Sequence, residues 1–294
     1  MRRFQTLRQL RRFKKLRRQF GLVYRTLGEL GEEPFVEPFW GRVNSQVASE
    51  FLPIPPINFL DLPAIKNTMF VDPDQEWIDS EVSFLNTRKD GFEKIIIEDT
   101  VGNPLRVPFN GINTSYNSIH HFYHIKRFEA ETKVKILSVT SVVEWGGGYG
   151  NLAKLWWRLK DQKTTYTIID TALFCSIQWL YLSSVLGPDK INLLKSRSDK
   201  ILANKVNLAP LALLENTEIA GDLFISTWGL SESAAEAQDY VVSKQWFGAK
   251  HLLLGFQDST KELRYASRLG KIAANDGATI VDIDFIPGNH YAFK

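Results

Sequence analysis

The sequence predicts an α/β fold in which a seven-stranded, mostly parallel sheet carries helices on both faces and follows an N-terminal extension. From residue 139 onward, short apolar runs alternate with longer helical patterns, as expected for parallel strands joined by helical crossovers. A glycine-rich turn at residues 144–150 joins the first strand to the first helix. A last strand at 290–293 follows a Pro-Gly-Asn turn, so we expect it to return as a hairpin and run antiparallel.

Composition divides the 294 residues into three regions with boundaries near residues 28 and 110. Residues 1–28 form a basic amphipathic arm that holds ten Lys or Arg and no acid. The rest of the chain holds 26 basic and 33 acidic residues, a net charge of −7. We expect residues 29–110 to form a proline-rich wrapping segment with a hairpin, and residues 111–294 to form the main domain.

The arm has the pattern of a helix that binds a membrane surface. Leu10, Phe13, Leu16 and Phe20 fall on one side of such a helix, and most of the basic residues fall on the other. We therefore expect the arm to bind an anionic inner membrane, where each cation contributes about 1 kcal/mol. Nucleic acid is the competing partner, which we do not expect, because the acidic body opposes a polyanion. A solvated tail is the remaining alternative, and a chain that begins at Gly21 is expected to stay folded.

The second region is expected to be extended. Residues 34–73 hold seven of the twelve prolines, a density that blocks long helices and central strands. Trp40 and Phe51 are too apolar for a free linker, so this segment should pack on the body. Residues 92–107 read as a hairpin with a Gly-Asn-Pro turn at 102–104.

The main domain alternates strands and helices along its whole length. Apolar runs of strand length are separated by turn residues and by helical periodicity, and Ser231 is placed to cap a helix. We expect strands at 139–144, 166–170, 191–194, 222–226, 251–255, 279–283 and 290–293, helices at 115–131, 151–159, 172–186, 232–243 and 261–275, and a helix or loop at 202–215.

The helix at 115–131 carries His120, His121 and His124. His120 and His124 stand four residues apart on one face, a spacing that can hold a metal ion. A third ligand is not visible, so we expect no metal, and histidines without chemistry remain an equal interpretation for His120 and His121. The single cysteine, Cys175, excludes a disulfide framework and a cysteine-rich metal site.

The glycine turn carries the clearest functional signal. Glu144-x-Gly146-x-Gly148-x-Gly150 matches the acid and three glycines of an S-adenosylmethionine (SAM) fold. Glycines let backbone N–H groups and the helix N-terminus approach a ligand closely. The acid suits SAM, which carries an ammonium group and a cationic sulfur, and it would repel a pyrophosphate. Gly148-x-Gly150-x-x-Ala153 also satisfies a looser dinucleotide pattern, which keeps NAD open.

A second acid supports a nucleoside cofactor. Asp170 ends the second predicted strand, 20 residues after Gly150, where a carboxylate can accept both ribose hydroxyls. A carboxylate at this position can serve NAD and SAM alike. The structural alternative for Asp170 is a helix cap. The antiparallel last strand favours SAM over NAD. The predicted cofactor site comprises Glu144, Trp145, Gly146, Gly147, Gly148, Tyr149, Gly150, Asp170, Thr171, Ser226 and Thr227.

Three segments carry a family resemblance. Residues 144–151 (EWGGGYGN), 222–232 (DLFISTWGLSE) and 288–291 (GNHY) resemble the sugar O-methyltransferases of bacterial surface-polysaccharide biosynthesis, a family of class I SAM-dependent methyltransferases. The resemblance covers about residues 110–294. It implies a Rossmann-like class I methyltransferase fold and cytoplasmic methylation of a sugar hydroxyl on an O-antigen (lipopolysaccharide), capsule or exopolysaccharide, or on its precursor. The arm lies outside the resemblance and would suit an acceptor carried on an inner-membrane lipid.

Methyl transfer to an alcohol requires a base for the departing proton. Reacting groups of an open α/β sheet gather at the carboxyl edge of its strands, which His290, Glu232 and His124 are expected to reach. Histidine titrates near neutrality and is the better base. A cap-region acid is the structural alternative for Glu232, and a hydrogen-bonded strand histidine is the alternative for His290.

Two other functions stay open at this point. An NAD-dependent sugar oxidoreductase or epimerase is favoured only by the looser glycine pattern, and no Tyr-x-x-x-Lys pair is visible near the sheet edge. A non-catalytic, membrane-associated scaffold could also keep the fold. Trp145 and Trp228 could stack on a sugar or an adenine, or pack in the core. No pattern predicts an oligomeric state.

Overall fold

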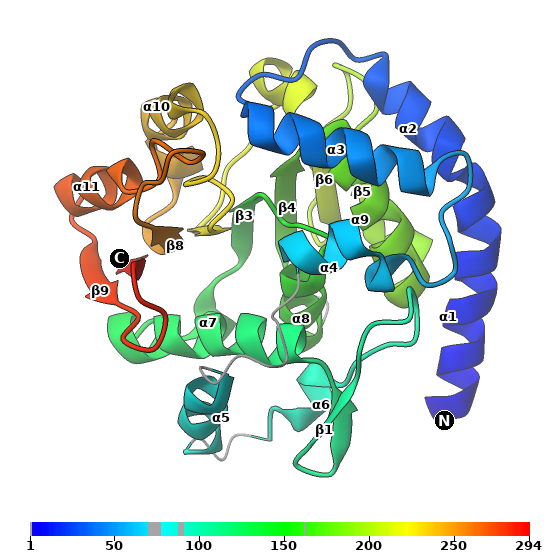
Figure 1. Ribbon diagram of the computed structural model, residues 1–294, viewed down its shortest axis with the longest axis horizontal. Helices are drawn as coiled ribbons and strands as arrows, with labels where there is room; N and C mark the ends of the chain where they lie inside the picture. The colour runs from blue at the N-terminus through cyan, green and yellow to red at the C-terminus, as the bar shows by residue number, and fades with distance from the viewer. Residues whose placement is uncertain (1, 70–77, 88–90, 162) are drawn as a thin grey trace.

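The computed structural model describes residues 2–69, 78–87, 91–161 and 163–294, and an eight-stranded sheet forms its centre (Figure 1). The strands lie in the order β5-β6-β4-β3-β7-β8-β10-β9, and β10 runs antiparallel to both of its neighbours. The predicted α/β class and the antiparallel last strand are confirmed. The strands are β3 (Ser141–Trp145), β4 (Thr165–Asp170), β5 (Ile191–Leu193), β6 (Val206–Pro210), β7 (Leu223–Thr227), β8 (His251–Gln257), β9 (Thr279–Asp282) and β10 (Asn289–Phe293).

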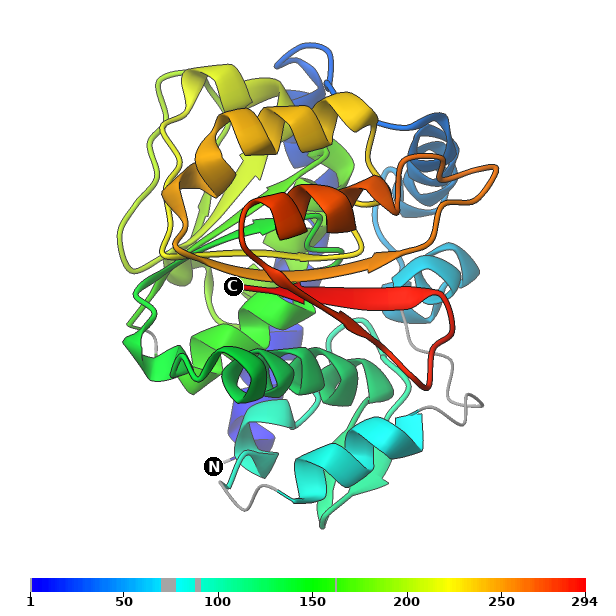
Figure 2. The same ribbon diagram turned by 90° about the vertical axis from the view of Figure 1, so that its left-hand side faces the viewer.

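Helices cover both faces of the sheet (Figure 2). Side chains alternate along β3, so Val142 joins the core beneath one layer of helices and Val143 joins the core beneath the other. The first layer consists of α7 (Tyr116–Thr132), α8 (Asn151–Leu159) and α9 (Ala172–Val185), and the second consists of α10 (Ala235–Ser243) and α11 (Arg268–Asn275). The predicted positions of α7, α8 and α9 are correct to within one or two residues.

Strand β6 was not predicted, because residues 202–215 read as a helix or loop. The structure places β6 between β4 and β5, with all five of its residues buried, followed by a 3₁₀ helix, η5 (Leu211–Asn216). Its polar Asn207 is tolerated there because the Oδ1 atom accepts from Asn192 Nδ2 at 2.8 Å and from the Leu202 N–H at 2.8 Å. The sheet therefore has eight strands instead of seven.

Two helix starts differ from the sequence prediction. α10 begins at Ala235 after an N-cap without a side-chain hydrogen bond, because Ser231 donates to the Trp228 carbonyl oxygen at 2.7 Å instead of capping the helix. α11 begins at Arg268 instead of residue 261. Both helices are therefore shorter at the start than the periodicity suggests.

The proline-rich region is helical instead of extended. It contains α3 (Pro38–Phe51), the 3₁₀ helix η2 (Phe59–Asp61) and α4 (Pro63–Met69). Pro38 and Pro63 each open a helix, a position where the missing N–H costs nothing. Residues 70–73 of this predicted segment lie outside the described residues.

The predicted hairpin is displaced along the chain. Helix α5 (Ile78–Asn86) is followed by a short helix, α6 (Glu93–Ile96), where the first strand was expected. The hairpin pairs β1 (Val107–Phe109) with β2 (Ile112–Thr114) instead. Its turn consists of Asn110 and Gly111, both with positive φ, which is the conformation that a tight two-residue hairpin turn requires.

The N-terminal arm is part of the body. It forms α1 (Arg2–Leu16), the 3₁₀ helix η1 (Arg17–Gln19) and α2 (Phe20–Gly28), which run along α9 (Figure 1). The apolar side chains of Phe13, Leu16 and Phe20 are buried in the main core. Removing residues 1–20 would uncover α9 and part of the main core, so we now expect this truncation to destabilise the chain. Among the described residues, no helix has the length and hydropathy needed to cross a bilayer.

A buried ionic network joins the arm to the main domain. The Lys154 ammonium, fully buried on α8, donates to Glu98 Oε1 at 2.7 Å. Arg158 donates to Asp99 Oδ2 at 2.6 Å, and Gln9 of the arm donates to Asp99 Oδ1 at 2.8 Å. Burial alone would raise the pKa of Glu98, but the adjacent Lys154 charge and several hydrogen bonds outweigh burial and lower it to about 2. Glu98 therefore stays ionised inside the protein.

Candidate functional site

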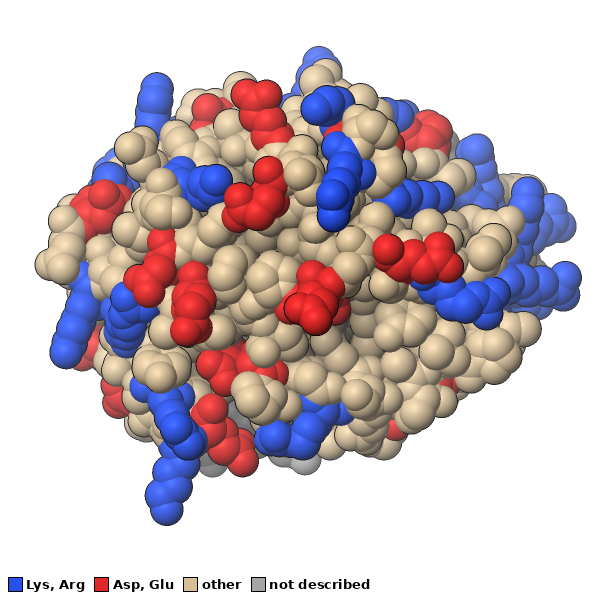
Figure 3. Space-filling view, turned by 90° about the horizontal axis from the view of Figure 1, so that it is seen from above, with Lys and Arg blue, Asp and Glu red and all other residues tan. Residues whose placement is uncertain are grey.

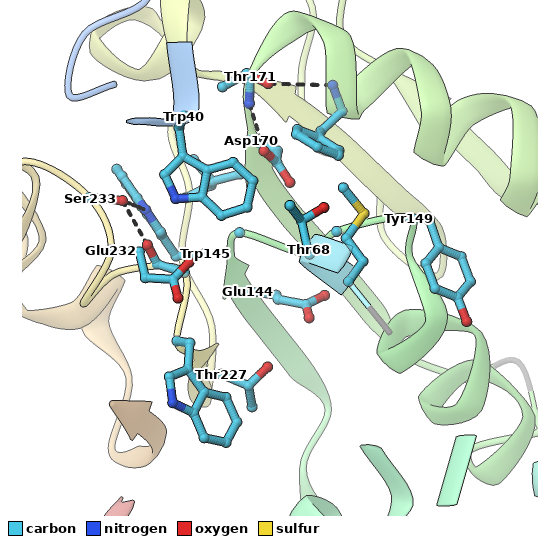
Figure 4. Close-up of a pocket in the computed structure, with 18 of the residues that line it drawn as sticks. Trp40, Thr68, Glu144, Trp145, Tyr149, Asp170, Thr171, Thr227, Glu232 and Ser233 are labelled. Carbon is cyan, nitrogen blue, oxygen red and sulfur yellow. Dashed lines mark hydrogen bonds between the residues drawn. The ribbon is translucent and has the colours of Figure 1, made fainter. Parts of the chain in front are cut away.

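A cavity of about 840 Å³ opens at the carboxyl ends of β3, β4 and β7. The glycine turn after β3, α7 and the helical N-terminal extension all supply lining residues. Figure 4 shows Trp40 and Thr68 of the extension beside Asp170 and Glu144. Eleven of the predicted site residues line it: Glu144, Trp145, Gly146, Gly147, Gly148, Tyr149, Asp170, Thr171, Thr227, Glu232 and His124. The structure therefore brings most of the predicted site residues together around one cavity.

The glycines of the turn are required for different reasons. Gly146, Gly148 and Gly150 have φ values of 75°, 53° and 93°, a region that disfavours other residues. A Cβ at Gly146 would lie 2.9 Å from the Gly229 Cα atom, and one at Gly150 would lie 2.9 Å from Leu182. At Gly148 the nearest atom would be the Met69 sulfur, at 3.7 Å. Gly146 and Gly150 are thus needed for packing, whereas a Cβ at Gly148 would make only an ordinary contact with the Met69 side chain, which also lines the cavity.

Glu144 lies at the bottom of the cavity and is almost fully buried. Its Oε2 atom accepts a hydrogen bond from the Tyr166 hydroxyl at 2.9 Å. Burial raises the pKa of Glu144 to about 8, and the negative charge of Asp170 acts in the same direction. A cation that approached this carboxyl group would reverse that shift.

Asp170 is held in place by its neighbours. Its Oδ1 atom accepts from the Thr171 N–H at 2.8 Å, and its Oδ2 atom accepts from Gln178 Nε2 at 2.7 Å. Gln178, which sequence reasoning missed, also donates to the Gly148 carbonyl oxygen at 2.9 Å and so ties the acid to the glycine turn. Burial raises the pKa of Asp170 to about 7 despite these hydrogen bonds. Figure 4 shows Asp170 and Glu144 facing the same space.

Aromatic side chains form the opposite wall. Trp40 of the N-terminal extension and Trp145 face the cavity across from Asp170 (Figure 4). Trp228 follows β7 with a positive φ of 69°, and its Nε1 atom donates to Asn289 Oδ1 at 2.7 Å. Glu232 is hydrogen-bonded to Trp40, and burial raises its pKa. This wall combines flat apolar faces with acceptor groups.

The cavity has an acidic lining. Glu37, Glu144, Asp170 and Glu232 line it, and Lys66 is the one Lys or Arg among the lining residues that the structure describes. Three of these acids have raised pKa values because they are buried without a nearby cation. Figure 3 shows acidic side chains around a hollow on one face of the molecule and basic side chains gathered toward the end where the arm lies. A positive charge brought close to these carboxyl groups would favour their ionised forms.

Three histidines of α7 reach the cavity, although only His124 was among the predicted site residues. His120 Nδ1 lies 2.6 Å from Glu81 Oε1, and His124 Nδ1 lies 2.6 Å from the Tyr291 hydroxyl. His121 lies among them with its pKa lowered to about 3, first by burial and then by its histidine neighbour. No group of three metal-ligating side chains occurs among the described residues.

Three predicted site residues lie outside the cavity lining. Ser226 is buried beneath the cavity, where its hydroxyl donates to the Trp145 carbonyl oxygen at 3.0 Å, and Gly150 packs on Leu182. His290 lies on β10 with its ring nitrogens 2.7 Å from Asp282 Oδ1 and 3.3 Å from Asp258 Oδ1. The strand pairing turns its ring toward these exposed carboxylates and Phe256.

No protein-family model matches the chain, and no curated protein matches its sequence. Fibrillarin of Aeropyrum pernix, solved with S-adenosylmethionine, aligns with 68% of this chain and 85% of that chain at 12% identity and a TM-score of 0.44. A SAM-dependent methyltransferase of Aquifex aeolicus aligns with 58% of this chain and 92% of that chain at 16% identity and a TM-score of 0.36.

The pyocyanin biosynthetic protein PhzM aligns with 60% of this chain at 12% identity and a TM-score of 0.40. The aligned part spans just over half of PhzM, 56% of its chain. Each of these likenesses concerns the fold, so the chemistry of the cavity has to be argued from its own residues.

Proposed function

We propose that the chain is a SAM-dependent O-methyltransferase. The acidic cavity above the glycine turn carries this proposal: buried carboxyl groups without a cationic partner favour a ligand that brings an ammonium group and a cationic sulfur. A dinucleotide would bring two phosphate charges to the same carboxylates, which would oppose its binding. Glu144, the acid that suits SAM, is therefore evidence against an NAD-dependent oxidoreductase or epimerase.

The residues of the turn fit this cofactor. Asp170 is placed to accept the ribose hydroxyls, and at Gly148, which has no Cβ and only the Met69 side chain nearby, a ligand can approach the backbone closely. Glu144 provides negative charge beneath the amino-acid end. When bound, SAM supplies a methyl carbon activated by its bond to a cationic sulfur. The protein holds this group and the acceptor in line and removes the proton of the acceptor hydroxyl.

We further propose that the acceptor is a sugar hydroxyl of a bacterial surface glycan or its precursor. The apolar face of a sugar ring packs well on indole rings, and Trp40, Trp145 and Trp228 line the cavity, with Trp40 and Trp228 partly exposed. Glu232 and Asn44 lie beside them and can bond sugar hydroxyls. A cavity of about 840 Å³ has room for a cofactor and one sugar ring.

Calorimetry tests the cofactor directly. We expect SAM and its demethylated product to bind with micromolar affinity and NAD to show no heat of binding. Binding should release protons, because the pKa values of Glu144 and Asp170, about 8 and about 7, fall when a cationic ligand arrives. Titrations in buffers of different ionisation enthalpy measure this release. Tight NAD binding without SAM binding would overturn the assignment.

The direction of the pH dependence follows from the same groups. Below pH 7 both carboxyl groups are protonated in the free protein, so SAM affinity should rise with pH between about 5.5 and 7.5, by up to about tenfold per unit for each proton released. In Glu144→Gln the affinity should be lower and its dependence on pH weaker. A wild-type affinity that stays constant over this range would contradict the proposed role of both acids.

We also propose that the arm holds the enzyme on the cytoplasmic face of an anionic inner membrane, near a lipid-linked acceptor. The apolar face of the arm packs on α9, so attraction of the arm to a membrane depends on the side chains that face solvent. Exposed side chains there include Phe4, which is 80% exposed, and Leu7, which is 47% exposed. The exposed basic residues beside them are Arg8, Arg11, Lys14, Lys15 and Arg18. Cations spaced along one helix face complement a layer of lipid phosphates.

A charge-reversal variant tests the arm without removing core residues. Arg8→Glu/Arg11→Glu/Lys15→Glu should weaken sedimentation with phosphatidylserine-containing liposomes by at least about 100-fold at low salt, given about 1 kcal/mol per charge. The matched control Lys250→Glu/Lys261→Glu/Lys271→Glu changes net charge equally at exposed positions far along the chain and should retain binding. Equal loss in both variants, or stronger binding to DNA than to liposomes, would count against the membrane.

A further inference from the structure

The three histidines of α7 differ in what holds them. His120 Nδ1 faces a carboxylate, Glu81 Oε1, at 2.6 Å, and Glu81 is completely buried on α5. His121 Nδ1 instead lies 2.9 Å from the Asn151 amide nitrogen, and His124 Nδ1 lies 2.6 Å from the Tyr291 hydroxyl. Of these three contacts, the one at His120 is the contact that can stabilise a positive imidazolium ring.

The contact with Glu81 also sets the tautomer of His120. A carboxylate accepts hydrogen bonds and cannot donate one, so the proton of the neutral ring lies on Nδ1 and the basic lone pair lies on Nε2. When Nε2 takes a proton, Glu81 stabilises the charge that forms. A histidine oriented by a buried carboxylate is the arrangement in which imidazole acts as a general base.

The other two rings are poorly suited to this task. Burial lowers the pKa of His121 to about 3, and it lowers the pKa of His124 well below its ordinary value. Among the described residues, the charged and titratable groups near His120 include Glu81 on α5, the rings of His121 and His124 on its own helix, and the Tyr291 hydroxyl beyond His124. Burial thus keeps His121 and His124 neutral, while His120 faces the carboxylate.

His120 also lies where the acceptor is expected. Its ring stacks on Trp228 with a centroid distance of 5.8 Å and an interplanar angle of 24°, and both residues line the cavity. Trp228 directly follows Thr227 at the carboxyl end of β7. The next residue, Gly229, packs against Gly146 of the glycine turn, so Trp228 lies beside that turn. A sugar ring packed against the Trp228 side of the cavity would therefore bring its hydroxyls toward His120.

We propose that His120, oriented by Glu81, is the general base of the methyl transfer. The proposal rests on the proposed methyltransferase function. The acceptor oxygen forms a bond to the methyl carbon as the carbon–sulfur bond breaks, and the electron pair of that bond stays on sulfur. The hydroxyl proton passes to His120 Nε2 and then to solvent, so that a methyl ether and neutral S-adenosylhomocysteine remain. Glu81 is a positioning residue that acts through the imidazole ring.

Turnover measurements test the base. With methyl glycosides of common hexoses as acceptor probes and S-adenosylhomocysteine release as the readout, His120→Ala and His120→Gln should lower turnover by about 10²–10⁴-fold. SAM affinity, measured by calorimetry, should stay within about threefold of wild type in both variants. The control His251→Gln removes a histidine of β8 that contacts Phe128 away from the cavity, and it should keep full turnover. Turnover of His120→Ala above a third of wild type would overturn the proposal.

A second measurement separates orientation from simple packing. Glu81→Gln keeps the shape of the side chain but can donate to Nδ1, so it should lower turnover and move the acidic limb of the turnover–pH profile, while Glu81→Asp restores part of the activity. In ¹⁵N spectra of histidine-labelled protein, wild-type His120 should be the Nδ1-protonated tautomer, and Glu81→Gln should lose that preference. This readout needs no acceptor. A wild-type His120 protonated on Nε2 would refute the proposed pairing of His120 with Glu81. A wild-type protein that binds no SAM would instead refute the methyltransferase function itself.

Discussion

Replacing Gly148 with valine is expected to abolish SAM binding in a chain that still folds. The Cβ direction at Gly148 points into the cavity, with the Met69 sulfur at 3.7 Å as its nearest neighbour, so the added methyl groups would occupy ligand space. The φ of 53° adds strain of about 1–2 kcal/mol, which a domain with a stability of about 5–15 kcal/mol tolerates. Calorimetry with SAM and a thermal melt measure both effects.

A matched variant separates strain from obstruction. Gly277 has a φ of 87° and nothing within 4 Å of its Cβ direction, and it lies after α11, outside the cavity. Gly277→Val should lower the melting temperature to a similar degree and leave SAM affinity unchanged. Gly148→Ala should weaken binding to an intermediate extent. If Gly148→Val bound SAM within about threefold of wild type, the cofactor would have to lie elsewhere.

Lys154→Met is expected to destabilise the protein by about 3–5 kcal/mol, the usual cost of leaving the partner of a buried ion pair uncompensated. The Lys154 ammonium lies 2.7 Å from Glu98 Oε1, and both side chains are completely shielded from solvent. Loss of the ammonium leaves a carboxylate whose burial then favours its protonated form. Urea unfolding at pH 7 measures the loss, and the double variant Lys154→Met/Glu98→Gln should recover part of it because no buried charge remains.

An exposed pair provides the control for this effect. Lys294 donates to Asp276 at 2.8 Å, with about a third or more of each side chain exposed, so Lys294→Met should cost less than about 1 kcal/mol. The pKa of about 2 at Glu98 sets the pH dependence. The stabilisation from Glu98 is present above its unfolded pKa of about 4.3 and is lost as the pH falls toward 2. A loss in Lys154→Met no larger than in Lys294→Met would contradict the role of the network.

The parts of the candidate cavity that sequence reasoning brought together are local. The glycine turn, the acid that precedes it and Asp170 each depend on a few neighbouring residues, since strand ends and positive φ values leave a short-range pattern. Helix α8 begins at Asn151 and ends at Leu159, as its periodicity predicted. These elements lie within residues 141–170, which form two neighbouring strands and the turn and helix between them.

The missed parts depend on contacts between distant segments. Glu81 meets His120 across 39 residues, and Gln9 meets Asp99 across 90, so neither partner could be found from spacing. Strand β6 was missed because its polar Asn207 is satisfied by Asn192 and Leu202, which lie outside the strand. The arm looked separable because its charge was visible in the sequence, whereas the burial of its apolar face on α9 was not.

The tryptophans that line the cavity should report ligand binding through their fluorescence. Three of the protein's eight tryptophans line the cavity: Trp40 and Trp228 are partly exposed, and Trp145 is buried where the second core meets the cavity. Trp156, Trp157 and Trp246 are buried in the two cores and do not line the cavity. Indole fluorescence is sensitive to nearby charge and to the loss of water. Ligand binding should therefore change the emission of the three cavity indoles and leave that of the core indoles constant. Substitution of Trp228 by phenylalanine would show how much of that signal comes from the acceptor side.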